Sequence, residues 1–303
     1  MYEYLSTSML QQFKTTKVNR YWNRDIKGKG VTVAVLDSGV HDHKDFKGRL
    51  HEQYDLLTDK VLPVADYDIY GHGTHVAGLI AGSVTGIAPE ADILPISVYD
   101  DHRCIIEDMS NAIDYIISWR HPVTNRPVDI VNMSFTNFYK INWDILMDKL
   151  KQNGITCVCS IGNYDKQIPP ITDQLLKNDY VDSRKYDIEV ARYPAYLHYP
   201  IVVGAVDVYG CLTSYTSSLR QVDTCQLGMD VISCCNNPRK GLYSSKSGTS
   251  MSTAIVSGML ALYKCENNNR TDEDLYNLLV NNYDSKYIVD NKQYIVSTMK
   301  LRG

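Results

Sequence analysis

Short apolar, β-branched runs alternate with amphipathic segments along most of the chain, and this alternation restricts the fold more than any other feature. The predicted elements follow one another as a strand in 31–40 that ends at Asp37, helix 70–83, strand 91–99, helix 105–120, strand 128–135, helix 143–154, strand 155–163, strand 199–210, a helix from about 250, and helix 271–282. Strands that alternate with helices predict a doubly wound, mostly parallel central sheet with helices on both faces. The expected fold class is therefore α/β.

No internal repeat, low-complexity tract or Pro/Gly/Ser linker divides the 303 residues, so we predict a single domain over residues 1–303. Residues 1–22 form an N-terminal arm that precedes the first strand. In this arm Leu5, Met9 and Phe13 recur at four-residue spacing. That spacing predicts a short helix lying on the body of the domain.

The composition excludes several classes of protein. A content of 44% apolar and 22% charged residues is typical of a soluble globular enzyme. The net charge of −4 gives no indication of the basic patch that nucleic-acid binding requires. No stretch approaches the ~18 consecutive apolar residues of a membrane span, and the N-terminus lacks the charged and apolar regions of a signal peptide. We expect a cytoplasmic protein that binds neither nucleic acid nor membrane.

The cysteines are interpreted as reduced thiols. The chain has eight of them: Cys104, Cys157, Cys159, Cys211, Cys225, Cys234, Cys235 and Cys265. Cys157 and Cys159 lie two positions apart, so on a strand they point to one face, as core residues do. A metal site would show a paired CxxC motif or histidines at ligand spacing, and we find neither in the sequence. We therefore expect no metal site.

The stretch SGTSMSTAIVSGMLAL, residues 247–262, contains four serines, of which one is a candidate nucleophile. From Met251 onward the apolar residues follow the i, i+3, i+4, i+7 pattern of a buried helix, and serines between them let a neighbouring element approach closely. Ser250 differs because it follows Gly248 and Thr249, where the helix begins. The helix dipole and the unpaired N–H groups there favour a developing oxyanion. Close packing is the alternative explanation for this serine.

Three further residues have the chemistry that a serine nucleophile requires. Asp37 ends a predicted strand, where an acid can point into the crevice at the carboxyl ends of a parallel sheet. His72 begins a helix between glycines, and Asn163 ends a strand and can donate its side-chain N–H to an oxyanion. A serine needs an imidazole to take its proton, and the imidazole needs a carboxylate that fixes its tautomer. Each residue alone also fits a cap or a turn. Coincidence does not explain all four in the order Asp, His, Asn, Ser, each within such a local sequence.

The blocks VAVLDSGV, GHGTHVAG, IVNMSF, SIGN and SGTSMS resemble the signature sequences of the subtilisin-like serine proteases, the subtilases, from about residue 19 to about residue 265. The resemblance implies a subtilisin-like fold and a serine-type endopeptidase. It implies that Asp37 orients His72, that His72 acts as general base and then general acid, and that Ser250 attacks the scissile carbonyl. Asn163 and the backbone N–H of Ser250 would form the oxyanion hole.

The substrate-binding segment departs from the family pattern. Subtilases usually read Ser-Leu-Gly-Gly where this chain reads Ser134-Phe135-Thr136-Asn137. We expect Ser134, Phe135 and Thr136 to bind substrate through backbone pairing. Side chains in place of glycines should narrow the primary pocket, which predicts strict specificity. The stretch 165–190, with ten charged residues, is predicted to be an insertion near the cleft, and a surface loop away from the substrate is the alternative.

Two other departures concern the nucleophile helix and calcium. Ser252 and Ala254 replace the alanine and proline that usually follow the nucleophile. Loss of the proline ring is expected to preserve activity while affecting the rate and the balance of hydrolysis against aminolysis. The short stretch LIAGSVTGIAP offers no carboxylate or asparagine ligand, so the calcium site of secreted relatives is expected to be missing, although Asp45 resembles one of its ligands. We expect no required cofactor and leave open a calcium site elsewhere.

Met1 lies only 36 residues before Asp37, which leaves no room for a signal peptide and a long pro-domain. We therefore expect a monomeric, intracellular processing protease of restricted specificity, acting on a peptide or precursor-protein substrate. A lantibiotic leader peptidase fits this description. A general intracellular protein-turnover subtilisin is the alternative within the class. A catalytically inactive, peptide-binding pseudoprotease and a peptide ligase are alternatives from other classes.

Overall fold

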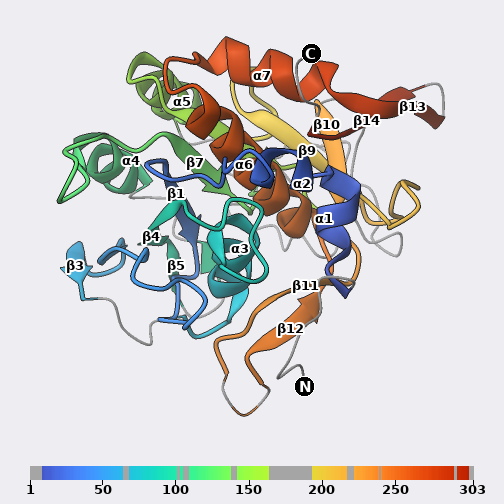
Figure 1. Ribbon diagram of the computed structural model, residues 1–303. Helices are drawn as coiled ribbons and strands as arrows, with labels where there is room; N and C mark the ends of the chain where they lie inside the picture. Colours follow the sequence, from blue (N-terminus) through green and yellow to red (C-terminus); the bar gives the residue numbers. More distant parts are fainter. Residues whose placement is uncertain are drawn as a thin grey trace, which may run out of the picture.

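A ten-stranded sheet forms the central layer of the described part of the chain (Figure 1). The computed structural model describes residues 9–63, 68–100, 103–104, 109–137, 142–163, 193–216, 222–237, 239, 241–289 and 292–299. In spatial order the strands are β13 (Tyr283–Val289), β14 (Lys292–Ser297), β10 (Thr224–Leu227), β9 (Ile201–Val206), β8 (Thr156–Ser160), β7 (Ile130–Met133), β1 (Thr32–Asp37), β4 (Asp92–Ser97), β2 (Gln53–Asp55) and β3 (Lys60–Leu62). Neighbours from β14 to β2 run parallel, and the two edge pairs run antiparallel. The predicted doubly wound, mostly parallel fold is confirmed.

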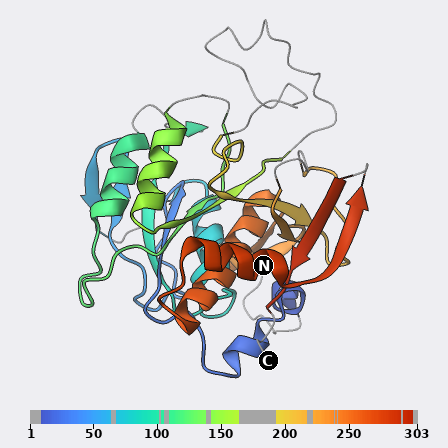
Figure 2. The ribbon, with the colours of Figure 1, turned by 90° about the horizontal axis from the view of Figure 1, so that it is seen from above.

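Helices cover both faces of this sheet. They are α1 (Gln11–Thr16), α2 (Asn19–Trp22), α3 (His72–Ala81), α4 (Met109–Ser118), α5 (Trp143–Gln152), α6 (Thr249–Glu266) and α7 (Asp272–Asn281). Seen from above, α4 and α5 lie on one side of the sheet, and α6 and α7 lie on the other (Figure 2). Helix α3 packs against α6 on that second side. A separate buried hydrophobic cluster fills each of the two interfaces.

Strand β1 shows how a central parallel strand supplies both layers. All six of its residues are buried. Successive side chains of a strand point to opposite faces, so Val33 and Val35 join the cluster on the α3 and α6 side, whereas Ala34 and Leu36 join the cluster on the α4 and α5 side. Burial on both faces explains the nearly continuous apolar sequence of this strand. It ends at Asp37, which places a carboxylate at the carboxyl edge of the sheet.

The N-terminal arm packs on the second side of the sheet. Leu10 and Phe13 are buried in the cluster beneath α3 and α6. The indole N–H of Trp22 donates to the carbonyl of Ile87 at 3.0 Å. The predicted short helix is present as α1, although Leu5 lies outside the described residues.

Several elements are not predicted from the sequence. They are helix α2, the strands β2, β3, β10, β13 and β14 of the main sheet, the pair β5 (Tyr99–Asp100) and β6 (Arg103–Cys104), and the hairpin β11 (Val231–Cys234) and β12 (Tyr243–Lys246). The stretch 165–190 lies outside the described residues, so its position near the cleft stays a prediction. None of the helices that the structure describes combines the length and the apolar character needed to cross a membrane.

Candidate active site

An open pocket of about 330 Å³ lies at the carboxyl edge of the sheet, where β1 ends and α3 and α6 begin. The residues singled out from the sequence that line it are Asp37, His72, Ser134, Phe135, Thr136, Asn163 and Ser250. They come from five separate regions of the chain. Ser38, Tyr70, Tyr99, Ser160, Gly162 and Thr249 are the other described residues that line it. The structure thus brings every predicted site residue to one pocket.

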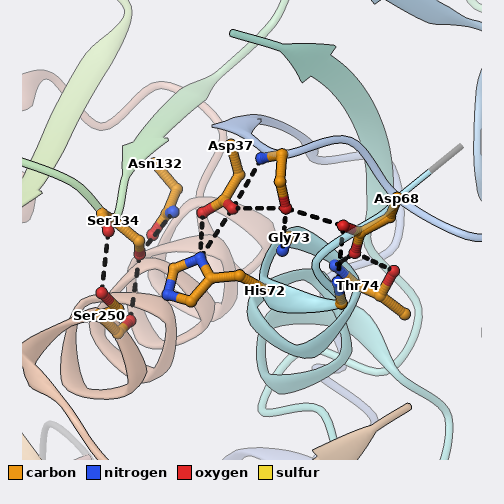
Figure 3. A network of polar contacts seen from close by, with 10 residues as sticks. Asp37, Asp68, His72, Gly73, Thr74, Asn132, Ser134 and Ser250 are labelled. Carbon is orange, nitrogen blue, oxygen red and sulfur yellow. Dashed lines mark hydrogen bonds and ion pairs between the residues drawn. The ribbon is translucent and has the colours of Figure 1, made fainter. Parts of the chain in front are cut away.

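Asp37 and His72 form a close hydrogen-bonded pair (Figure 3). The Nδ1 atom of His72 lies 2.7 Å from Oδ1 and 2.9 Å from Oδ2 of Asp37. A proton on Nδ1 satisfies this contact and leaves Nε2 of the neutral ring as a proton acceptor. Burial lowers the pKa of His72, but the charge of Asp37 and the hydrogen bond to it outweigh burial, so the pKa is raised above 6.5.

A second buried carboxylate, Asp68, accepts hydrogen bonds from residues next to this pair. It is not singled out from the sequence. Its Oδ1 accepts bonds of 2.8 Å from the hydroxyl of Ser38 and from the backbone N–H of Gly71. Its Oδ2 accepts the backbone N–H of Thr74 at 2.8 Å and the hydroxyl of Thr74. Asp68 therefore caps the start of α3, the helix that carries His72. An acid shortly before a helix start was the available signal.

Ser250 lies at the start of α6 and is only 8% exposed. Its hydroxyl donates to the backbone carbonyl of Ser134 at 2.8 Å, and the hydroxyl of Ser134 donates in return to the carbonyl of Ser250 at 3.1 Å. The acceptor is therefore Ser134 and not Nε2 of His72. This differs from the arrangement that the sequence implied. Figure 3 shows the ring of His72 on the side of Ser250 that faces Asp37, so the Ser250 hydroxyl must turn from Ser134 toward the ring before it can donate to Nε2.

Asn163 follows β8 and contacts the residue before Ser250. Its Oδ1 accepts the backbone N–H of Thr249 at 2.9 Å and the hydroxyl of Thr249 at 3.1 Å. These bonds fix which end of the amide accepts and present Nδ2 as its donor. A Cβ added to Gly248 would lie 3.1 Å from that Nδ2, a tight contact that would require the amide to shift by a few tenths of an ångström.

The predicted substrate segment directly follows β7. Ser134, Phe135 and Thr136 line the pocket, but Phe135 is only 5% exposed and packs against Trp143. The backbone of Asn137 pairs with that of Tyr193 through bonds of 3.0 and 2.8 Å. Phe135 therefore serves the core as well as the pocket wall, which the sequence pattern alone does not reveal.

The remaining serines of the α6 stretch have structural partners. The hydroxyls of Ser252 and Ser257 are buried and donate to the carbonyls of Gln226 and Thr253 at 2.8 and 3.0 Å. His75, one turn after His72, is fully buried, and burial lowers its pKa to about 3. A ring that stays neutral in this way is a core residue.

Comparison with known proteins identifies the same family as the sequence motifs. The profile of the Peptidase_S8 subtilase family matches residues 28–296. The chain is 31% identical over 263 residues to the Major intracellular serine protease of Bacillus subtilis (strain 168), covering 83% of this chain and 73% of that protein. It is 32% identical over 262 residues to the Intracellular serine protease of Paenibacillus polymyxa, covering 84% and 72%.

A solved structure supports the assignment at the level of the fold. The crystal structure of a cold adapted subtilisin-like serine proteinase has a TM-score of 0.73 to this chain at 25% identity, and the match covers 91% of both chains. Family profile, curated relatives and solved structure thus agree on the family. The chain belongs to the subtilase family and is a subtilisin-like serine protease, a hydrolase.

Proposed function

We propose that the chain is a serine endopeptidase with Asp37, His72 and Ser250 as its triad. The observation that carries this proposal is the paired Asp37–His72 contact of 2.7 and 2.9 Å in the same pocket as Ser250. In the reaction Ser250 turns toward Nε2 of His72, which takes its proton as Oγ attacks the scissile carbonyl. His72 then protonates the leaving amine, and water repeats the sequence to release the acid. This chemistry requires no metal or cofactor.

The oxyanion of the tetrahedral intermediate is assigned to Nδ2 of Asn163 and the backbone N–H of Ser250. Donors aimed at a developing negative charge contribute more to the rate than most other single effects, and loss of one donor lowers kcat by about 10²–10³. The contacts of Asn163 with Thr249 support this role, because they tie the amide to the residue before the nucleophile.

An extended peptide is the proposed substrate, paired along Ser134, Phe135 and Thr136. A substrate backbone N–H that bonds to the carbonyl of Ser134 competes with the hydroxyl of Ser250, which donates to the same oxygen. Binding therefore releases Ser250 toward His72. The side chains at Thr136 and Asn137, where glycines are usual, support restricted specificity. We assign the chain to processing of a precursor peptide in the cytoplasm, as a monomer, with lantibiotic leaders as one such substrate.

General protein turnover is the second candidate. It is favoured by the similarity to two proteins named as intracellular serine proteases. The two functions differ in substrate range. A turnover protease degrades unfolded casein at many positions, whereas a processing protease leaves casein intact and cleaves a leader-containing precursor at one bond. Product mapping by mass spectrometry on both substrates separates the two.

The catalytic assignment is tested by intact mass after treatment with a fluorophosphonate. We expect one adduct on the parent chain, one on Ser252→Ala, and none on Ser250→Ala, because only an activated serine reacts. Ser252→Ala is the matched control, since it removes a hydroxyl from the same helix two residues away. An adduct that persists on Ser250→Ala contradicts the assignment. A folded parent chain that takes no adduct favours the peptide-binding pseudoprotease instead.

A further inference from the structure

We propose that His51, Asp92 and His121 form a binding site for a divalent transition-metal ion, with Zn²⁺ as the preferred ion. The three side chains offer two imidazole nitrogens and a carboxylate, and their ligand atoms all lie within 4.8 Å of one another. Nitrogen and carboxylate ligands suit Zn²⁺, and three protein ligands leave the fourth tetrahedral position for water. The residues are far apart in the sequence, which explains why no ligand spacing is visible there.

The site lies at the amino ends of the parallel strands, whereas the catalytic pocket lies at their carboxyl ends. Asp92 begins β4, and the last residue of β4, Ser97, pairs with Asp37. His51 follows Leu50, whose backbone bridges Ile93, just after Asp92. A bound ion would therefore join three segments of the chain without contacting the proposed triad.

The distances are those of metal ligands and are too long for hydrogen bonds. Nε2 of His51 lies 3.6 Å from Oδ1 of Asp92, and Nε2 of His121 lies 3.7 Å from Oδ2. An N–H···O bond is about 2.7–3.2 Å long. Two ligands on a tetrahedral Zn²⁺, each about 2.1 Å from the ion, are about 3.4 Å apart. Both histidines thus approach different oxygens of one carboxylate at nearly the spacing that a shared ion produces.

His51 provides a second observation. Its Nε2 atom is buried and has no hydrogen-bond partner among the described residues. A buried polar atom without a partner is costly, and a metal ion between the three side chains would give this nitrogen a partner. The rings of Trp119 and His121 lie 5.0 Å from the His51 ring by centroid distance and hold it against the carboxylate. The side chains of His51 and His121 remain 15% exposed, and that of Asp92 18% exposed, so an ion can enter.

Binding requires a change of tautomer at His121. Its Nδ1 accepts the backbone N–H groups of Val123 and Thr124, each at 3.1 Å, so the neutral ring carries its proton on Nε2. When Nε2 binds the ion, the ring proton resides on Nδ1, and the two backbone N–H groups lose their acceptor. They lie in an exposed turn, where Val123 is 86% exposed, so water replaces the lost bonds. The site therefore links metal binding to the opening of this turn.

A second group of candidate ligands, His43, Asp45 and Cys234, serves as a comparison. There Nδ1 of His43 accepts the backbone N–H of Asp45 at 3.1 Å, and Nε2 lies 2.8 Å from the carbonyl of Leu242. Both ring nitrogens are thus engaged within a buried cluster. This group has no histidine nitrogen available to an ion, unlike His51.

Zinc titration by calorimetry, with no peptide substrate present, tests the site. We expect one Zn²⁺ per chain, and a loss of affinity in His51→Gln and in His121→Gln larger than the roughly 10–100-fold that an outer-shell partner contributes. His198→Gln, which removes an exposed imidazole elsewhere, should bind zinc like the parent. At about 100-fold over Kd, zinc should raise the Tm of the parent by about 5 °C and leave that of the two ligand variants unchanged.

Amide hydrogen exchange gives a readout that an incidental surface ion would not change. Zinc should accelerate exchange at Val123 and Thr124 in the parent and leave it unchanged in His121→Gln. No binding by the parent, or equal binding by the parent and both ligand variants, would overturn the proposal. Zinc binding without faster exchange at these two amides would overturn ligation through Nε2 of His121. Since none of these measurements depends on peptide cleavage, their failure is distinct from failure of the proposed function.

Discussion

Ser38 lies between the buried carboxylates of Asp37 and Asp68, and the direction of its hydroxyl decides which partners remain for Asp37. Its hydroxyl lies 2.8 Å from Oδ1 of Asp68 and 3.2 Å from Oδ1 of Asp37, and it has one proton to donate. The shorter contact assigns that proton to Asp68. Asp37 then keeps the backbone N–H of Ser38, at 2.7 Å, and His72 as its main partners. Burial raises the pKa of Asp68, and the charge of Asp37 also raises it, whereas bonds from Thr74 and Ser38 lower it.

The raised pKa of His72 predicts the pH dependence of activity. Below this pKa the imidazole is protonated and cannot accept the proton of Ser250, so kcat/KM should rise with pH through an inflection above 6.5. The raised pKa of His72 also contributes to the stability of the folded state. This contribution is fully present below pH 6.5 and is lost as the pH rises through the pKa of the folded state. Asp37→Asn removes the group that raises the pKa and leaves burial, which lowers it, so the inflection should move down and kcat should fall by about 10⁴.

The inflection is measured in the parent from initial rates. In Asp37→Asn, whose rate is too low for this, NMR titration of the His72 ring measures the pKa directly. Glu90→Gln serves as the control, because it removes an acidic charge from a surface residue that contacts Lys27, away from the pocket. An unchanged His72 titration in Asp37→Asn would contradict the electrostatic explanation.

At the scale of elements, the sequence predicts those whose residues show a regular apolar pattern. The strands β1, β4, β7, β8 and β9 and the helices α3, α4, α5 and α7 lie within the predicted ranges, and α6 begins within one residue of its predicted start. A buried strand is recognised as an apolar run and a helix by its 3.6-residue period. The missed strands lack such patterns. In β10, Thr224 and Gln226 are fully buried but polar. The amide of Gln226 is satisfied by Ser297 and Leu227, contacts that local sequence cannot reveal.

The same limit applies to the site. Local motifs predict Asp37, His72, Asn163 and Ser250, since each ends a strand or begins a helix. They do not predict the support of His72 through Ser38 and Asp68. They also do not predict that the Ser250 hydroxyl donates to Ser134, because that contact joins the segment after β7 to the start of α6, which only the folded sheet brings together.

Helix α7 provides a test of local sequence signals. Thr271 is its N-cap, in a capping box in which the threonine hydroxyl accepts the backbone N–H of Asp274 and the Asp274 carboxylate accepts that of Thr271. Thr271→Ala should cost about 1 kcal/mol of the free energy of unfolding and lower Tm by about 2 °C. Thr271→Ser keeps the hydroxyl and should melt with the parent in calorimetry. Equal losses in both variants would assign the effect to the methyl group.

At the scale of the whole molecule, buried thiols report on both layers of the fold. Cys157 and Cys159 lie in the cluster beneath α4 and α5, and Cys234 lies in the cluster beneath α3 and α6. Burial raises the pKa of all three thiols, and it raises that of Cys225 to about 12. Because the thiolate is the reactive form, these groups are inert while the fold is closed. Each layer thus carries its own reporter of opening.

Thiol alkylation in the folded state, mapped by peptide mass spectrometry, should therefore measure whether the chain opens as one unit. We expect Cys211, which is exposed, to react at once, and Cys157 and Cys234 to react slowly and at the same rate. Equal rates follow if the two layers share one sheet and one cooperative transition, as the predicted single domain requires. Cys211→Ser removes this exposed thiol and should leave both slow rates unchanged. If Cys234 reacted well before Cys157, the α3 and α6 layer would open independently, and the single-domain prediction would be wrong.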